Sequence, residues 1–255
     1  MEYLIIIWLM LIGAILGSFL GCMGYRIPNK IKTTYPSSFC GSCKKPLKWY
    51  MNIPIISYVY QGGKCSYCKE KIGFIYFLCE VIGALMLPIN YVVFGFELEF
   101  FVSSILTCAL IVTIVSDFKY YYISDRVLII SGVLIIIAQL CFKDQTDIVM
   151  NLCSAVLLFI IMYVIKLLGN AMFKKESLGD GDIKLMALIA LSVGWLNSFV
   201  TLFIGALTAL IYSLITMKKN KEGIVPFGPF LLLGSIAVIY LQDIITPLIM
   251  KYLVI

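Results

Sequence analysis

Apolar residues fill most of the chain in long runs that short polar stretches separate. Eight runs reach or approach the roughly 20 residues that a membrane-spanning helix needs: residues 3–24, 74–94, 98–116, 127–142, 148–168, 183–195, 198–217 and 227–250. A backbone in lipid must satisfy its own hydrogen bonds, and the alternating pattern of a membrane β-barrel is absent. We therefore predict an all-α fold, a polytopic membrane helical bundle of about eight spans.

Two of these runs are ambiguous as membrane spans. Residues 183–195 are few for a full crossing, and only the turn "GWLNS" separates them from the next run. We expect these two runs to pair closely, and seven spans is the alternative count. The first run has the length of a signal peptide, but it lacks a basic start and further spans follow. We expect it to be a retained anchor.

Composition agrees with a membrane protein, and charge predicts its orientation. Of 255 residues, 62% are hydrophobic and 13% charged, which is too apolar for a soluble domain. If the spans alternate in direction, 18 of the 20 Lys and Arg residues fall on one side, and Lys143 and Lys251 fall on the other. Basic loops stay in the cytoplasm. The net charge of +6 is thus an orientation signal, and no motif points to nucleic acid.

Four cysteines lie in the first predicted cytoplasmic loop, in two CxxC pairs: Cys40 with Cys43, and Cys65 with Cys68. Each pair can hold one side of a metal ion, and two pairs complete a tetrahedron, so we predict structural Zn²⁺ in a zinc-ribbon-like loop. A redox dithiol, an iron–sulfur cluster and unrelated cysteines are the alternatives. The expected division is a first span at 1–24, a cytoplasmic four-cysteine zinc-binding loop domain at 25–72 and a membrane domain at 73–255.

Five of the 14 acidic residues lie at or near the predicted cytoplasmic ends of spans: Glu80, Asp117, Asp125, Asp180 and Asp182. Asp117 closes the third run and Asp182 opens the sixth, so both lie at one membrane face. The chain has no histidine, which excludes Ser-His and Cys-His catalysis. Two carboxyls about 3 Å apart share a proton, so that one acts as base on a water and the other as acid.

Each aspartate also has a simpler interpretation. Asp182 follows a glycine and precedes an apolar run, as a helix N-cap does. Asp117 could end a span or pair with Lys119. Glycines 179 and 181 permit close backbone approach, which would let an extended substrate lie beside the carboxylate.

Two other classes of protein explain part of this pattern. A transporter would use the acids as an ion path, but transporters have internal repeats and acids near the bilayer centre, and neither is visible here. A membrane scaffold would use the cysteine loop to bind a partner, which leaves the glycine–aspartate stretch as a mere cap.

Six segments, in order, resemble the type IV prepilin peptidase family (prepilin leader peptidase/N-methyltransferase), which are GxGD aspartic proteases. They read "LGSFLGCMGYRIP", "CGSCKKPLKWYMNIPIISYVYQGGKCSYCKEKI", "FLCE", "SDFKYYYISD", "GDGDIKL" and "VPFGPFLLLG". The resemblance implies removal of the basic leader from prepilin-like precursors at the cytoplasmic face of the bacterial plasma membrane, between Gly and a residue such as Phe. Asp117 and Asp182 match the catalytic aspartates, so the resemblance implies that residues 73–255 are a membrane aspartic protease domain.

The resemblance further implies that the new N-terminal amine is methylated with S-adenosylmethionine, a step associated with the loop of Cys40, Cys43, Cys65 and Cys68. No motif marks the site of that donor. Asp180 departs from the family pattern as an extra acid at the variable GxGD position, and "ISD", ending at Asp125, stands where "LPD" or "IPD" is common. Glu80 ends a family-like segment and is expected to serve methylation or packing.

Overall fold

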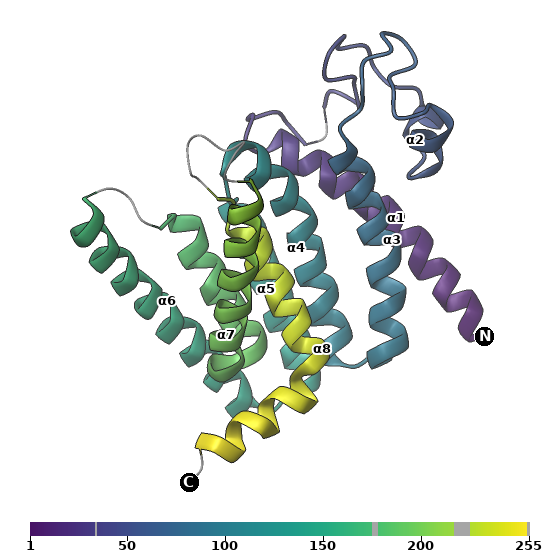
Figure 1. Cartoon of the computed structure of the whole chain (residues 1–255). Helices are drawn as coiled ribbons and strands as arrows, with labels where there is room; N and C mark the ends of the chain where they lie inside the picture. The colour runs from purple at the N-terminus through teal and green to yellow at the C-terminus, as the bar shows by residue number, and fades with distance from the viewer. Residues whose placement is uncertain (34, 175–177, 217–224, 254–255) are drawn as a thin grey trace.

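The apolar runs form long helices in the computed structural model, which describes residues 1–33, 35–174, 178–216 and 225–253 (Figure 1). Within these ranges, seven helices are long and apolar enough to cross a membrane. They are α1 Glu2–Arg26, α3 Phe74–Phe94, α4 Leu98–Tyr120, α5 Asp125–Phe142, α6 Gln145–Phe173, α7 Asp180–Thr216 and α8 Gly228–Leu253. The all-helical prediction is confirmed.

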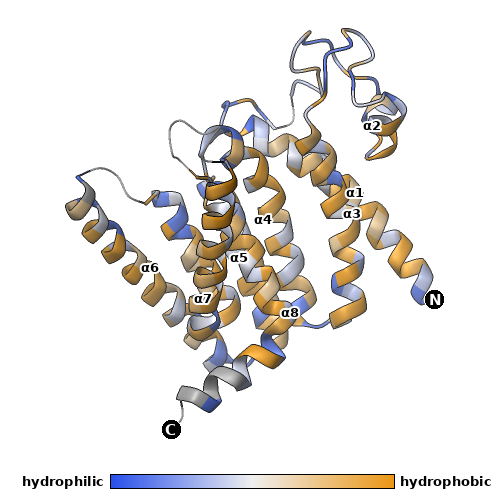
Figure 2. Ribbon diagram, in the orientation of Figure 1, coloured by the Kyte–Doolittle hydropathy of each residue, from blue (hydrophilic) through white to orange (hydrophobic). Residues whose placement is uncertain are grey.

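Large apolar side chains cover the outside of the bundle. Val156, Ile160 and Leu167 on α6, for example, are all exposed, and Figure 2 shows apolar residues along the bodies of the helices. A soluble protein rarely exposes so much contiguous apolar surface. The most enclosed helix is α4, which packs against α1, α3, α5 and α8. The chain is a multi-pass membrane protein with α4 at its centre.

The two runs that flank "GWLNS" merge into the single helix α7, but the helix breaks at Gly194, where φ is 77° and ψ is 172°. The first arm runs parallel to α5, since Lys184 pairs with Asp125 at one end and Gln139 donates to the Leu191 carbonyl near the other. The second arm runs antiparallel to α8. Because α5 and α8 begin at the same end, the two arms of α7 run in opposite directions.

Glycines allow α1 and α3 to touch through their backbones. A Cβ on Gly17 would lie 2.4 Å from the Cys79 carbonyl oxygen, and one on Gly13 would lie 2.1 Å from that of Gly83. Small residues four apart are typical of close helix pairs in membranes. This contact sets Ser18 of α1 against Glu80 of α3, where the Ser18 hydroxyl donates to the carboxylate over 2.7 Å.

The loop between α1 and α3 stands beyond one end of the bundle, which we call the loop end (Figure 1). This loop contains a short 3-10 helix at Trp49–Asn52 and α2 at Ile56–Tyr60. The helices α4 and α6 and the second arm of α7 also end at the loop end, and α5, α7 and α8 begin there. Four basic residues counted toward the orientation lie outside the described residues: Lys175, Lys218, Lys219 and Lys221.

Candidate active site and cysteine cluster

Asp117 lies in the last turn of α4 and is only 5% exposed. Its Oδ2 accepts a hydrogen bond from the backbone N–H of Gly228, the first residue of α8, over 3.1 Å. Lys119 does not pair with it, because its ammonium donates to the Tyr76 hydroxyl on α3 instead. The interpretation of Asp117 as a partner for Lys119 is therefore wrong, and its carboxylate turns toward the start of α8.

Asp182 lies in the first turn of α7, and its two carboxylate oxygens differ. The backbone N–H of Gly179, just before the helix, is close enough to stabilise the carboxylate, and a Cβ on Gly179 would lie 3.1 Å from its Oδ2. Its Oδ1 is buried and has no hydrogen-bond partner among the described residues, so Oδ2 is the oxygen that faces Gly179. An acid at the third helical position that reaches back in this way forms half of a capping box. The capping interpretation is thus partly right, but one oxygen remains available for chemistry.

The two aspartates are brought together by packing around Ile123, in the connection between α4 and α5. A Cβ on Gly181 would lie 2.8 Å from Ile123 Cβ, and a Cβ on Gly228 would lie 2.8 Å from Ile123 Cδ1. Asp117 is near enough to act electrostatically on Asp182. Gly181 was one of two glycines expected to give a substrate room beside Asp182. In the structure the space beside Gly181 is occupied by Ile123.

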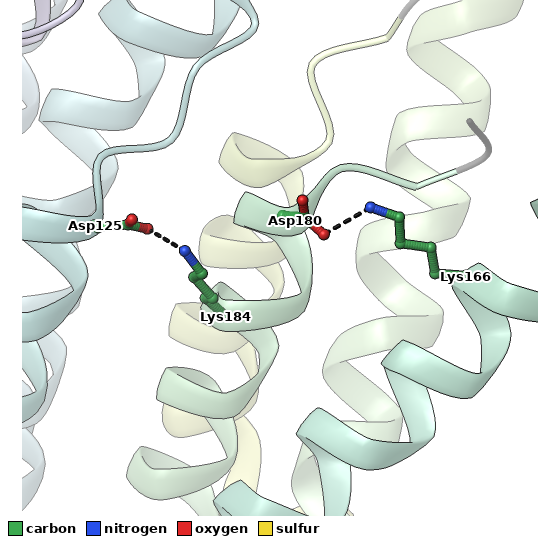
Figure 3. A network of polar contacts seen from close by, with 4 residues as sticks. All are labelled: Asp125, Lys166, Asp180 and Lys184. Carbon is green, nitrogen blue, oxygen red and sulfur yellow. Dashed lines mark hydrogen bonds and ion pairs between the residues drawn. The ribbon is translucent and has the colours of Figure 1, made fainter. Parts of the chain in front are cut away.

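Two further acids at this end of the bundle, Asp180 and Asp125, pair with lysines of neighbouring helices (Figure 3). Asp180 pairs with Lys166 of α6 over 2.6 Å, and Asp125 pairs with Lys184 of α7 over 2.8 Å. Both acids are exposed, and exposed pairs contribute little to stability. Asp180 neighbours Asp182 in sequence, but its charge is matched by a lysine at the surface.

The four cysteines of the loop converge, and their Sγ atoms all lie within 4.8 Å of one another. The Cys40 and Cys68 sulfurs are 3.8 Å apart, close to the roughly 3.8 Å edge of a tetrahedron with Zn–S bonds of 2.3 Å. The alternative that these cysteines are unrelated is therefore wrong. The loop is zinc-ribbon-like, and its donor set and spacing fit Zn²⁺.

Each CxxC pair lies in the same backbone turn, so the loop contains a local duplication that the sequence analysis missed. Cys40 N–H donates to the carbonyl five residues on, as Cys65 N–H does. Lys44 and Lys69, each directly after a pair, have φ of 59° and 60°. The signal was available in the aligned segments "FCGSCKKPL" and "KCSYCKEKI".

Electrostatics around the cluster favour a cation. Burial opposes ionisation of Cys40, but the backbone N–H groups of Cys43 and Ser42 outweigh it and lower the pKa of Cys40 to about 7. The Glu70 backbone favours the Cys68 thiolate, but desolvation and the three neighbouring thiols raise the pKa of Cys68 to about 11. The thiols therefore compete for negative charge, which a bound divalent metal would relieve.

Sequence comparisons agree with this arrangement. A family model described as the bacterial peptidase A24 N-terminal domain matches residues 11–94, and one described as the type IV leader peptidase family matches residues 104–214. No solved structure matches the chain.

Relatives match over nearly the whole length. The chain is 31% identical to the prepilin leader peptidase/N-methyltransferase of Bacillus subtilis (strain 168) over 242 residues, which cover 93% of this chain and 95% of that protein. It is 30% identical to the type 4 prepilin-like proteins leader peptide-processing enzyme of Escherichia coli O78:H11, over 90% of this chain and 91% of that protein. Identity to the Pseudomonas aeruginosa prepilin leader peptidase/N-methyltransferase is 29%, over 90% and 88%.

Proposed function

The chain belongs to the type IV leader peptidase family, and from this premise we propose that Asp117 and Asp182 are the catalytic carboxyls with which it removes the leader of prepilin-like precursors. The observation that carries the proposal is the buried Oδ1 of Asp182, which lies beside the buried Asp117 and has no partner in the described part of the chain. A buried carboxylate oxygen without a partner is rare in folded proteins and calls for an explanation. A catalytic water is the partner that this site suggests.

In this mechanism the pair holds one proton between its two carboxyls. The ionised carboxyl takes a proton from water as the water attacks the scissile carbonyl, while the protonated carboxyl donates to the carbonyl oxygen. No covalent enzyme intermediate is formed. The two groups titrate as a unit, so the proton belongs to the pair rather than to one residue. The Gly228 N–H holds Asp117 in place by a hydrogen bond, and the Gly179 N–H lies near Asp182 and favours its charged form.

We further propose that the loop end faces the cytoplasm of a bacterial plasma membrane, because most of the described basic residues lie at that end. The precursor's apolar helix would then lie in the bilayer against the bundle, with its basic leader on the cytoplasmic side. Cys40, Cys43, Cys65 and Cys68 would hold a structural Zn²⁺ that fixes the fold of the loop domain.

A second reaction is supported by the names of the relatives, several of which are N-methyltransferases. We propose that this chain also methylates the new N-terminal amine with S-adenosylmethionine. When bound, that donor supplies an electrophilic methyl group.

Replacement of the aspartates tests the peptidase proposal. Purified Asp117→Asn and Asp182→Asn proteins should leave a prepilin-like precursor uncut on a gel and by mass spectrometry, although both variants insert in the membrane. Asp180→Asn is a matched control, because Asp180 lies in the same helical turn but pairs with Lys166 at the surface. It should cut at the wild-type rate. Cleavage by either of the first two variants would overturn the assignment.

A further inference from the structure

A large cavity at the loop end is separate from the aspartate pair. It has a volume of about 870 Å³ and lies between α1, α3 and the cysteine loop, and its lining includes neither Asp117 nor Asp182. This volume suits a small-molecule ligand. Tyr58 of the loop stacks on Phe77 of α3 in its wall, with ring centroids 4.7 Å apart. Such an aromatic wall suits a ligand with a flat ring.

Glu80 reaches this cavity from α3 as a half-buried carboxylate. Its Oε1 accepts from the Ser18 hydroxyl over 2.7 Å, and its Oε2 accepts from the Ile55 backbone N–H over 2.6 Å. Ile55 has φ of 63°, which is strained for a β-branched residue. Such strain is often found at functional sites. Three elements thus hold one carboxylate at a fixed position.

No described cation neutralises Glu80, because neither ion pair found among the described residues includes it. The lining contains three basic residues, Arg26, Lys71 and Lys119, and none of them forms an ion pair or hydrogen bond with Glu80 in the described part of the chain. Arg26 donates to the backbone carbonyls of residues 32, 33 and 36, and Lys119 donates to Tyr76. A partly desolvated carboxylate without a counter-ion is costly. Glu80 is therefore suited to bind a cation supplied by a ligand.

We propose that this cavity is a second active site, in which the sulfonium methyl donor binds and Glu80 receives the α-ammonium of the cut substrate. The inference rests on the methylation step of the proposed function. It locates that step in this cavity and assigns Glu80 as its general base. An α-amino group has a pKa of about 7.7–8.0, so at neutral pH most of it is protonated and not nucleophilic. A carboxylate that lacks a cation both binds the ammonium and accepts its proton.

The reaction balances without a further reactant. One N–H bond of the ammonium breaks and its proton passes to Glu80, which leaves a free amine. The amine lone pair forms a bond to the methyl carbon as the carbon–sulfur bond breaks, and the electron pair of that bond stays on sulfur. The products are a methylated ammonium and a neutral thioether, and Glu80 then returns its proton to water.

The last turn of α4 separates the two sites. Asp117 faces α8, whereas Lys119, two residues later, lines the cavity. Two residues turn a helix by roughly 200°, so these side chains lie on opposite sides of α4. The new N-terminus must therefore leave the aspartates and pass the end of α4 before it is methylated. Cys40 and Cys65 also line the cavity, which joins the metal site to its wall.

Two variants and two measurements test this inference. The substrate is a synthetic peptide that begins with a free Phe amine, so that methylation is measured without prior cleavage. Glu80→Gln should lower the methylation rate by about 100-fold or more, as loss of a general base does, while precursor cleavage and donor affinity stay at wild-type values. Glu99→Gln is the control, because Glu99 accepts a side-chain hydrogen bond from Gln242 and is not in the cavity lining.

Calorimetric titration of S-adenosylmethionine into the full protein gives a readout that does not depend on turnover. Ser57→Trp, which adds a ring to the cavity lining, should abolish donor binding and leave precursor cleavage intact. Methylation by Glu80→Gln at the wild-type rate, or donor binding by Ser57→Trp at wild-type affinity, would overturn the inference.

Wild-type results separate this inference from the peptidase assignment. A wild-type protein that cuts precursor but neither binds donor nor methylates the peptide would overturn the inference and leave the peptidase assignment standing. A wild-type protein that methylates the peptide but does not cut precursor would overturn the peptidase assignment and leave the inference standing.

Discussion

The contact between Gly228 and Asp117 offers a sensitive test of the aspartate site. Gly228 donates its N–H to Asp117 and is tightly enclosed. In Gly228→Ala the new methyl carbon would lie 2.8 Å from Ile123 Cδ1, 3.0 Å from Thr113 Cγ2 and 3.2 Å from Asp117 Oδ2. Carbon atoms prefer a separation of about 3.5–4.0 Å. The start of α8 must therefore move by a large fraction of an ångström.

That movement displaces the Gly228 N–H, which positions the carboxylate of Asp117. Gly181 also lies against Ile123, which limits how far that side chain can move. A misplacement of about 1 Å in an active site costs about 100-fold in rate, which corresponds to about 2.7 kcal/mol of transition-state stabilisation at about 1.36 kcal/mol per tenfold. We expect Gly228→Ala to lower kcat/KM for precursor cleavage by about this factor.

The assay is cleavage of a purified precursor in detergent, with unfolding temperature measured in parallel. Gly132→Ala on α5 is the control, because its methyl would lie at an ordinary 3.5 Å from Leu188 Cδ1. It should keep the wild-type rate and gain up to about 1 kcal/mol of stability from helix propensity. Equal rates for Gly228→Ala and Gly132→Ala would refute the reasoning, since the crowding around Asp117 would then have no consequence.

Three further changes have defined outcomes. Gly17→Leu should lower the free energy of unfolding by about 1–3 kcal/mol, because its Cβ would press on the Cys79 backbone of α3 at 2.4 Å; an unfolding temperature equal to that of Gly132→Ala would contradict the backbone contact. Gly194→Ala should lower the free energy of unfolding by about 1–3 kcal/mol, because it places a side chain at φ 77°. The same thermal melt measures it, and an unchanged stability would mean that α7 does not turn at this residue. Cys43→Ser should reduce zinc measured by mass spectrometry from about one ion per chain, whereas Cys141→Ser, an exposed cysteine on α5, should retain it; full zinc in Cys43→Ser would remove that cysteine from the site.

Much of the fold is predictable from the sequence, because membrane helices depend on local properties. The apolar runs predict the helices, and the basic residues predict which helix ends share a side. The path of α7 is harder to predict. Its two runs form two helical arms with no loop between them, and the reversal depends on a single residue, Gly194, whose φ only glycine adopts readily. The spacing of Gly13, Gly17 and Gly21 is typical of a helix that packs closely against another. The sequence does not indicate that α3 is the helix it packs against.

The candidate site was predictable in its residues but not in its contacts. The absence of histidine and the family-like motifs single out Asp117 and Asp182. The Gly228 N–H that holds Asp117 lies 111 residues away. The position of the Ile123 side chain between Gly181 and Gly228 depends on tertiary packing, so no local sequence pattern predicts it. Glu80 was expected to serve methylation or packing without a stated partner. Its bond to the Ile55 backbone depends on an irregular loop conformation that no helical or strand pattern encodes.

The central claim is that Asp117 and Asp182 act as one unit, and the most direct test is a double-mutant comparison of single-turnover cleavage. Precursor is mixed with excess wild-type, Asp117→Asn, Asp182→Asn or doubly substituted protein, and the mature N-terminus is counted by mass spectrometry. Residues that act as a unit have strongly non-additive effects. We predict that each single variant falls to the background rate and that the double variant is no slower. Single variants that retain partial activity, with losses that multiply in the double variant, would contradict a shared catalytic pair.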